Sequence, residues 1–329
     1  MAGKAKIAIA LATVAIITVI AAMVAIGGTK PWQETYTVPH VGKYGIYALD
    51  LATNRTSLLY STNDEIFTSA LRLNAAGDSL VFAQKVNSTS DSSTEIFTLR
   101  VEGGSPARVT ANSHWDLYPT WSPNGSQIAF LSKREGDLDI YVINSDGSGE
   151  RRLYDSGTND ADIDWRGSTI VFTSNFTIWR MDGDGTKAAQ VTQPQNAGIW
   201  GTANLPIGDY DPRLSPDGTR IAFERLEDPF APNGGYNIFT IRTDGTQETR
   251  LTSTGFAQGL PSWSPSGERI AYVVAAFNGT GVYDIYTVNA DGTGNGNATP
   301  SYFPTGFLCY SPAFSKDASK LYFIGQWSQ

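Results

Sequence analysis

Short runs of β-forming residues, several with alternating apolar and polar positions, recur along the chain from Tyr44 onward, and turns separate them. In the clearest case, PTWSPNGSQIAF (119–130), two such runs flank a Ser-Pro-Asn-Gly sequence. Proline presets φ for a turn, and Asn-Gly tolerates the positive φ that a tight turn requires. This stretch therefore predicts two short strands joined as a β-hairpin.

The hairpin pattern is repeated six times, with 42–51 residues between successive closing aromatic residues. The copies are LRLNAAGDSLVF (71–82), PTWSPNGSQIAF (119–130), DIDWRGSTIVF (162–172), PRLSPDGTRIAF (212–223), PSWSPSGERIAY (261–272) and PAFSKDASKLYF (312–323). A fixed period of this length is typical of repeat architectures. The recurrence, rather than any single copy, therefore indicates the fold.

A second predicted hairpin follows each copy except the last. It consists of an alternating run, an acidic-Gly or Gly-rich turn and a short final run such as ARVT or TRLT. The alternating runs with their turns are EIFTLRVEGG (95–104), DIYVINSDGS (139–148), TIWRMDGDGT (177–186), NIFTIRTDGT (237–246) and DIYTVNADGT (284–293). Each repeat thus has four strands in roughly 40–50 residues, which is the period of a β-propeller blade.

The last repeat reaches the C-terminus with only its first two strands, and the missing pair is found at the start of the domain. The sequences GIYALDLATN (45–54) and TSLLY (56–60) match the second hairpin. An open blade would leave unpaired strand edges, so these N-terminal strands should complete the C-terminal blade. The sequence predicts an all-β, six-bladed propeller of four-stranded blades over residues 44–329.

The N-terminal segment 7–26 contains twenty residues without a charge, enough to cross a membrane as a helix. Lys4 and Lys6 precede it, so the positive-inside rule places residues 1–6 in the cytoplasm and the propeller outside. Residues 27–43, with their glycines and prolines, read as a linker. A cleaved signal peptide, with small residues at Ala21 and Ala22, is the alternative interpretation.

The composition argues against nucleic-acid binding, disulfides and histidine-based zinc sites. The net charge is −8 and basic residues do not cluster, so a nucleic-acid surface is not expected. A single cysteine, Cys309, excludes an internal disulfide, and we expect it to be buried in the inner strand of the last blade. With only two histidines, His40 and His114, histidine-based zinc chemistry is not expected either.

The repeats resemble the WD-like repeats of TolB-type propellers. The resemblance rests on WSPNG, LSPDG and WSPSG followed by IAF or IAY, then DIY and a DG turn, and it covers residues 44–329. It implies a six-bladed propeller outside the cytoplasm that binds proteins. The predicted membrane anchor stands where TolB has a small α/β domain, so TolB's own partnership is not carried over.

No catalytic motif accompanies the repeats. The sequence contains neither the nucleophile elbow G-x-S-x-G nor a Gly-rich phosphate loop. It therefore predicts a non-enzymatic module without a cofactor. We expect a protein partner in the membrane or cell envelope, with the propeller serving as a scaffold or an accessory subunit of a membrane complex.

Acidic residues recur at two positions in the repeats. The first set lies in Asp-Gly hairpin turns: Asp146, Asp184, Asp244 and Asp291. Residues 182–185 also resemble the start of a Ca²⁺ loop, but the twelfth position holds Gln193 rather than glutamate. The structural role in the turn is the favoured interpretation.

The second acidic set precedes the first strand of three blades: Asp116, Asp160 and Asp209. Near the mouth of the channel these carboxylates could hold a cation such as Ca²⁺, as a metal-dependent hydrolase or lactonase would require. The equivalent positions elsewhere are Thr68, Gln258 and Cys309, so the ring is incomplete. Aspartate is also a common turn residue that binds local amides.

The longest loops are expected on one face of the propeller, opposite the short hairpin turns, and they are rich in aromatic residues. These residues are Trp200, Phe230, Tyr236, Phe277, Tyr283, Tyr302, Phe303 and Phe307. Long loops on a rigid scaffold commonly carry binding sites, and exposed aromatics are common anchors. We predict the partner surface here, for a protein or alternatively for a glycan or peptide. Packing of the same residues onto the blades is the competing interpretation.

Six N-x-S/T sequons are candidates for glycosylation outside the membrane. They lie at Asn54, Asn87, Asn124, Asn175, Asn278 and Asn297. Asparagine next to glycine, serine or threonine is also ordinary turn composition.

Overall fold

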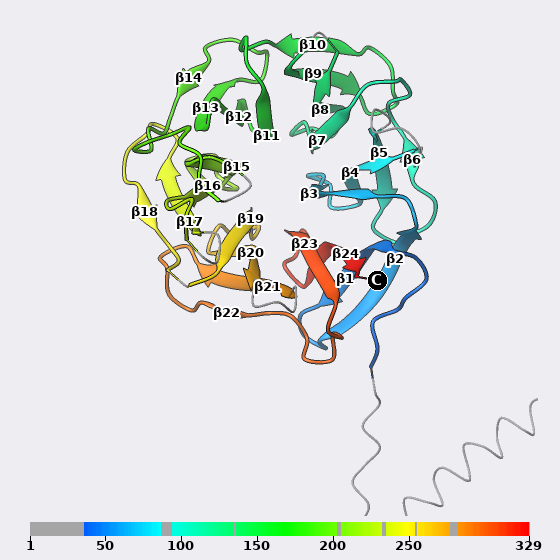
Figure 1. Cartoon of the computed structure of the whole chain (residues 1–329). Coiled ribbons are helices and arrows are strands. Elements are labelled where there is room, and N and C mark those ends of the chain that lie inside the picture. The colour runs from blue at the N-terminus through cyan, green and yellow to red at the C-terminus, as the bar shows by residue number, and fades with distance from the viewer. Residues whose placement is uncertain are drawn as a thin grey trace, which may run out of the picture. The chain divides into compact units, whose positions relative to one another are not determined.

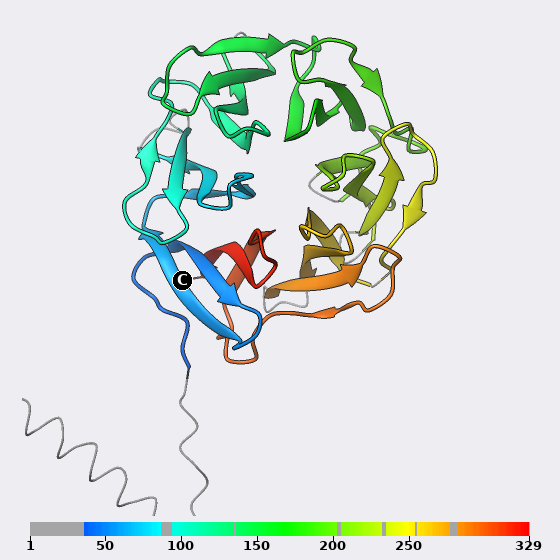
Figure 2. The same ribbon diagram turned by 180° about the vertical axis from the view of Figure 1, so that it is seen from behind.

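The computed structural model describes residues 36–328, except 87–93, 135, 203–204, 232–234, 254 and 277–281. The strands of this part of the chain form six four-stranded antiparallel sheets. The sheets stand around a common centre as the blades of a propeller (Figure 1), and the view from behind shows the same ring (Figure 2). The predicted six-bladed all-β architecture is confirmed.

Each of blades 1 to 3 consists of four strands that are consecutive along the chain, and the first of them is the innermost (Figure 1). Blade 1 consists of β3 (Ile66–Leu73), β4 (Ser79–Lys85), β5 (Thr94–Arg100) and β6 (Ala107–Arg108). Blade 2 consists of β7 (Asp116–Trp121), β8 (Gln127–Lys133), β9 (Leu138–Asn144) and β10 (Arg151–Tyr154). Blade 3 consists of β11 (Asp160–Arg166), β12 (Thr169–Ser174), β13 (Thr177–Asp182) and β14 (Ala189–Gln190).

Blades 4 and 5 repeat this plan, whereas blade 6 combines the two ends of the domain. Blade 4 consists of β15 (Gly208–Leu214), β16 (Arg220–Leu226), β17 (Tyr236–Arg242) and β18 (Thr249–Arg250). Blade 5 consists of β19 (Ala257–Trp263), β20 (Arg269–Ala276), β21 (Val282–Asn289) and β22 (Gly296–Asn297). Blade 6 consists of β23 (Phe307–Phe314), β24 (Lys320–Trp327), β1 (Tyr44–Asp50) and β2 (Arg55–Thr62).

The ring closes through the pairing of β1 with β24, as the repeat count predicts. The antiparallel register runs from Tyr44 opposite Gln326 to Asp50 opposite Lys320 without a shift. The Tyr47 ring stacks on that of Phe323, with centroids 5.4 Å apart. Because β1 pairs with the outer side of β24, the second strand of blade 6 has hydrogen-bonded neighbours on both sides, as in the other blades.

The recurring aromatic residue that closes each first hairpin belongs to the core. All six are fully buried: Phe82, Phe130, Phe172, Phe223, Tyr272 and Phe323. Apolar residues of neighbouring blades pack around them, so that Ile96 of blade 1 shares a cluster with Ile128 of blade 2. The repeated closing aromatic residue of the sequence therefore corresponds to one large, fully buried side chain in each blade.

The short turns of the hairpins carry the Asp-Gly sequences, and their predicted turn role is confirmed. In each, the aspartate Oδ1 accepts hydrogen bonds from the backbone N–H and the hydroxyl of the residue two positions later. The glycine that follows has a positive φ, as at Gly245 (83°). These bonds lower the pKa of each aspartate: Asp146, Asp184, Asp244 and Asp291.

The apolar segment 7–26 and the linker residues up to 35 lie outside the described residues. Among the residues that are described, no helix is long and apolar enough to cross a membrane. The last residues of the predicted linker pack on blade 6, where Val38 is buried and Pro39 accepts a hydrogen bond from the Tyr47 hydroxyl. The compact propeller unit accordingly begins at Val38.

Candidate functional site

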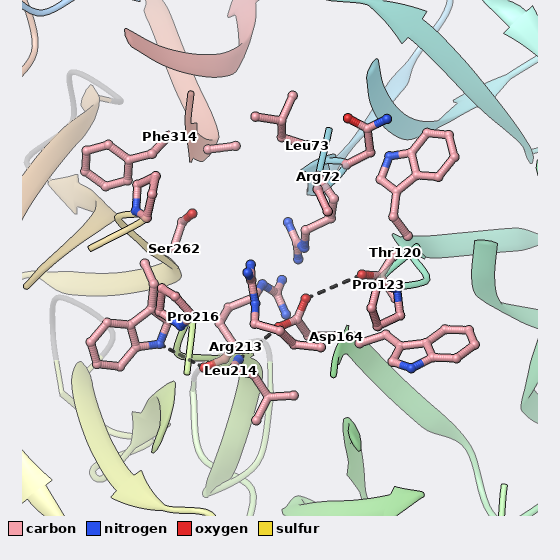
Figure 3. Close-up of a pocket in the computed structure, with 18 of the residues that line it drawn as sticks. Arg72, Leu73, Thr120, Pro123, Asp164, Arg213, Leu214, Pro216, Ser262 and Phe314 are labelled. Atoms are coloured by element: carbon pink, nitrogen blue, oxygen red, sulfur yellow. Dashed lines mark hydrogen bonds between the residues drawn. The ribbon is translucent and has the colours of Figure 1, made fainter. Parts of the chain in front are cut away.

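A cavity of about 300 Å³ lies at the end of the central channel that carries the short hairpin turns (Figure 3). Residues of those turns, including Asn74, Pro123, Pro216 and Pro265, form its rim. Among the residues of its wall, one equivalent position near the end of the first strand recurs in every blade: Arg72, Thr120, Asp164, Arg213, Ser262 and Ala313. The repeat thus builds one ring of six variable side chains.

A β-bulge in each first strand turns these side chains inward. The register between first and second strands shifts in every blade, for example between Leu117 and Thr120. In five blades the bulged residue has a positive φ of 46–55°: Tyr118, Asp162, Asp211, Leu260 and Ser311. A bulge bends its strand and re-aims the neighbouring side chains, and non-glycine residues with positive φ are typical of functional sites.

Two arginines enter the cavity from blades 1 and 4. The Arg213 guanidinium donates to Oδ1 of Asp211 at 3.0 Å and to the carbonyl oxygen of Pro212 at 2.6 Å. Arg72 donates from Nη1 to the carbonyl oxygen of Leu71 at 2.9 Å. In the described part of the chain, the buried Nε atoms of both arginines have no hydrogen-bond partner. Each guanidinium therefore retains free donor capacity.

Asp164 is the acidic member of the ring and connects three blades. Its Oδ2 accepts a hydrogen bond from the backbone N–H of Leu214 at 2.9 Å, and its Oδ1 accepts one from the Thr120 hydroxyl at 3.4 Å. Burial lowers the pKa of Arg72, but the charge of Asp164 opposes that change. Asp164 therefore both fixes the ring and compensates part of its positive charge.

Three further acidic residues, Asp162, Asp211 and Glu224, are buried next to this ring. The backbone N–H of Asp211 donates to Oδ2 of Asp162 at 3.3 Å, and that of Leu260 donates to Oε2 of Glu224 at 3.0 Å. Burial raises the pKa of Asp162 to about 6 and that of Glu224 to about 8. Burial, followed by the charge of Asp162, raises the pKa of Asp211 well above its usual value.

The predicted metal candidates Asp116, Asp160 and Asp209 are fully buried at the start of the first strands of their blades. Each is bound by residues of its own blade or of the loop that leads into it. Asp116 accepts from the Ser132 hydroxyl, and Asp160 accepts from the Ser156 hydroxyl. Asp209 pairs with Arg225. Burial raises the pKa of Asp160 to about 7. Within the described residues, no group of three or more His, Cys, Asp and Glu side chains is placed to hold a metal ion.

The predicted aromatic surface divides into exposed and packed members. Trp200 and Phe230 are 62% and 64% exposed. Phe307 is only 5% exposed and packs in the core of blade 6, while Tyr283 lies against the ring of Tyr310. The remaining three are partly buried: Tyr236, Tyr302 and Phe303. Phe277 lies outside the described residues.

The loops that carry Trp200 and Phe230 are joined to each other. The backbone N–H and the hydroxyl of Thr202 both donate to the carbonyl oxygen of Pro229, at 2.9 and 3.2 Å. Ile199, next to Trp200, is 49% exposed. These hydrogen bonds therefore connect the two segments that carry the exposed Trp200 and Phe230.

Cys309 is fully buried in β23, the inner strand of blade 6, which confirms its predicted position. Four sequon asparagines are exposed: Asn54, Asn124, Asn175 and Asn297. The other two, Asn87 and Asn278, lie outside the described residues.

Sequence reasoning did not identify the charged residues of the channel. The motifs are defined by the residues that the copies share, whereas Arg72, Asp164 and Arg213 occupy a motif position that differs from copy to copy. Comparing the same motif position across the six copies reads Arg, Thr, Asp, Arg, Ser and Ala. That comparison would have identified the ring, because equivalent positions of a closed repeat face one axis.

The chain is similar in sequence to proteins of the TolB propeller family. The family described as the TolB beta propeller domain matches residues 33–199. An uncharacterized protein of Agrobacterium fabrum is 31% identical over 193 residues, covering 54% of this chain and 61% of that protein. The Tol-Pal system protein TolB of Desulfosudis oleivorans is 31% identical over 111 residues, covering 32% of this chain and 25% of that protein. This chain therefore spans less than two thirds of either relative.

Solved structures share the fold at low sequence identity. A structure from Agrobacterium tumefaciens assigned to TolB has a TM-score of 0.65 at 19% identity, covering 87% of this chain and 99% of that one. An oligogalacturonate lyase bound to manganese has a TM-score of 0.55 at 11% identity, covering 87% and 83%. Since a structure assigned to TolB and a lyase share this architecture, the fold alone does not decide the function.

Proposed function

Because the chain belongs to the TolB-type β-propeller family, we propose that its propeller is a protein-binding module held outside the cytoplasm by the apolar segment 7–26. In this proposal residues 1–6 stay in the cytoplasm and the propeller docks a protein of the membrane or cell envelope. The family membership and the name of the Desulfosudis relative, a Tol-Pal system protein, support a role in protein interaction.

The observation that carries the proposal is the joined pair of loops with exposed aromatic side chains. Large aromatic residues dominate the binding energy of many protein interfaces. Trp200 and Phe230 each expose more than half of their surface, although folding normally buries such side chains. The hydrogen bonds from Thr202 to Pro229 hold the two loops in place, which lowers the entropic cost of binding a partner.

The test is a native purification of the full chain from detergent-solubilised membranes, followed by identification of stoichiometric companions. The Trp200→Ala/Phe230→Ala double variant should lose the companion, by analogy with hot-spot residues. Trp115→Ala is the matched control, since Trp115 is 37% exposed but belongs to the start of another blade. Purification of monomer alone from the wild type, or equal retention by the double variant, would contradict the proposal.

The membrane topology is tested separately. A protease added to intact cells or spheroplasts should reach the propeller but not residues 1–6, and the mature chain should retain segment 7–26. N-terminal sequencing that begins after Ala21 or Ala22 would instead identify a cleaved signal peptide.

A further inference from the structure

The two arginines of the cavity ring come from opposite sides of the propeller. Arg72 belongs to blade 1 and Arg213 to blade 4, and in a ring of six these blades face one another (Figure 1). Both side chains extend into the middle of the cavity (Figure 3). Their guanidinium groups are therefore placed to act on one ligand from two sides.

The hydrogen bonds of the protein do not use up these donors. A guanidinium has five N–H groups, and the described contacts use two of them at Arg213 and one at Arg72. Arg213 is only 4% exposed, and its Nε is buried without a partner among the described residues, as is the Nε of Arg72. Because both Nε atoms are buried, the donors left for a ligand are the unused N–H groups on the Nη atoms of the two arginines.

The charge of the cavity wall also points to an anion. The lining contains four cationic residues, Arg72, Arg166, Arg213 and Lys316, and one acidic residue, Asp164. Behind it, Asp211 pairs with Arg213 and offsets part of this positive charge. The whole chain, in contrast, has a net charge of −8. A positively charged cavity within an acidic protein concentrates anions locally.

The shape and the apolar part of the wall select the kind of anion. Trp121, Trp263 and Phe314 line the cavity together with prolines of the short turns. These three side chains are mostly buried in the core, and the part of them that faces the cavity makes its wall partly apolar, as is typical of pockets for organic ligands. Planar guanidinium groups match a carboxylate through two parallel hydrogen bonds.

We propose that the short-turn end of the channel binds the carboxylate of a small organic ligand between Arg72 and Arg213. The volume of about 300 Å³ is at the lower end for ligand pockets, so the ligand is a small organic acid or the C-terminal residue of a peptide. The site lies on the face opposite the loops of Trp200 and Phe230. It is therefore independent of the protein-binding surface proposed above.

The experiment measures binding of simple probes to the purified full chain by isothermal titration calorimetry. Benzoate should bind at concentrations below about 10 mM, and the neutral isostere benzamide should bind at least about tenfold more weakly. Arg72→Gln and Arg213→Gln should each weaken benzoate binding by about tenfold or more. Arg100→Gln is the matched control, because Arg100 is exposed near a short turn outside the cavity and should leave binding unchanged.

Several outcomes overturn the proposal: no saturable binding of benzoate, equal binding of benzamide, unchanged binding in Arg72→Gln, or phosphate binding as tightly as benzoate. Arg72 makes no ion pair among the described residues, so its variant should fold even if Arg213→Gln does not, as circular dichroism would verify.

A short peptide with a free C-terminus, compared with its C-terminal amide, distinguishes a peptide terminus from a free organic acid as the ligand. Stronger binding of the free peptide than of benzoate assigns the site to a peptide terminus, and the reverse assigns it to a free acid. Retention of benzoate binding by Trp200→Ala/Phe230→Ala would separate this site from the proposed partner surface.

Discussion

The guanidinium of Arg225 binds the carboxylate of Asp209 at two points, with Nε 2.5 Å from Oδ1 and Nη2 2.9 Å from Oδ2. Asp209 is fully buried, and the Arg225 side chain is 13% exposed. Arg225 also bridges to both carboxylate oxygens of Glu248. This candidate metal ligand is therefore part of an ion pair that links β15 to β16 inside blade 4.

Arg225→Ala should destabilise the propeller by about 3–5 kcal/mol, because it leaves the buried carboxylate of Asp209 without its partner. The free energy of unfolding in urea measures the effect. Arg100→Ala is the control, since the Arg100–Asp78 pair is exposed and should contribute no more than about 1 kcal/mol. Equal losses in the two variants would show that the buried pair has no special role.

Glu224→Gln should change how stability depends on pH. Burial, together with the charge of Asp162, raises the folded-state pKa of Glu224 from 4.5 to about 8. Between these values the folded protein holds a proton that the unfolded chain releases, so the free energy of unfolding falls as pH rises through this window. The variant lacks this titration and should be more stable than the wild type at pH above 8.

Thermal unfolding of both proteins from pH 4 to pH 9 checks this prediction, and the slope should become shallower in Glu224→Gln. Asp162 and Asp211 still titrate, so part of the slope remains. Glu268→Gln, at an exposed position in a short turn, serves as the control. Parallel curves for wild type and Glu224→Gln would refute the assignment.

Gly325→Ala should weaken the closure of the ring. A Cβ at Gly325 would lie 2.4 Å from Cζ of Phe307 and 2.6 Å from Cε2 of Tyr47, both packed in blade 6. Overpacking of this kind typically costs about 1–3 kcal/mol. Gly296→Ala in β22 is the matched control, because no atom lies within 4 Å of its Cβ position.

The comparison is made by urea unfolding, and Gly296→Ala should stay within about 0.5 kcal/mol of the wild type. A loss of stability in Gly296→Ala equal to that in Gly325→Ala would mean that backbone entropy in the strand, not crowding in blade 6, determines the effect.

The Cys309 thiol should not react with a thiol reagent in the folded protein. It is fully buried, and burial raises its pKa well above the usual value, so the reactive thiolate is scarce. One equivalent should react after unfolding in urea, because the chain has a single cysteine. Rapid labelling of the native protein would contradict the position of Cys309 in the inner strand of blade 6.

Most of the propeller was predictable from local patterns along the chain. Each blade repeats the same strand and turn signals, and Phe130 or Phe223 marks the same buried position in its own repeat. The pairing of β1 with β24 also followed, since an incomplete last blade requires two strands from the other end. These features depend on hydrophobic periodicity and on turn residues, both of which can be recognised in short stretches of sequence.

The candidate sites depended on contacts between residues far apart in the chain. Asp116, Asp160 and Asp209 occupy equivalent positions, but Ser132, Ser156 and Arg225 decide what each carboxylate binds.

Sequence alone determined the number of blades and the closure of the ring, because both follow from a repeat that is visible in short stretches. Only the tertiary structure decided that Arg72 and Arg213, 141 residues apart in the chain, meet in one cavity. Closing the ring places equivalent positions around a common axis, and the character of the cavity then depends on residues that no single repeat contains.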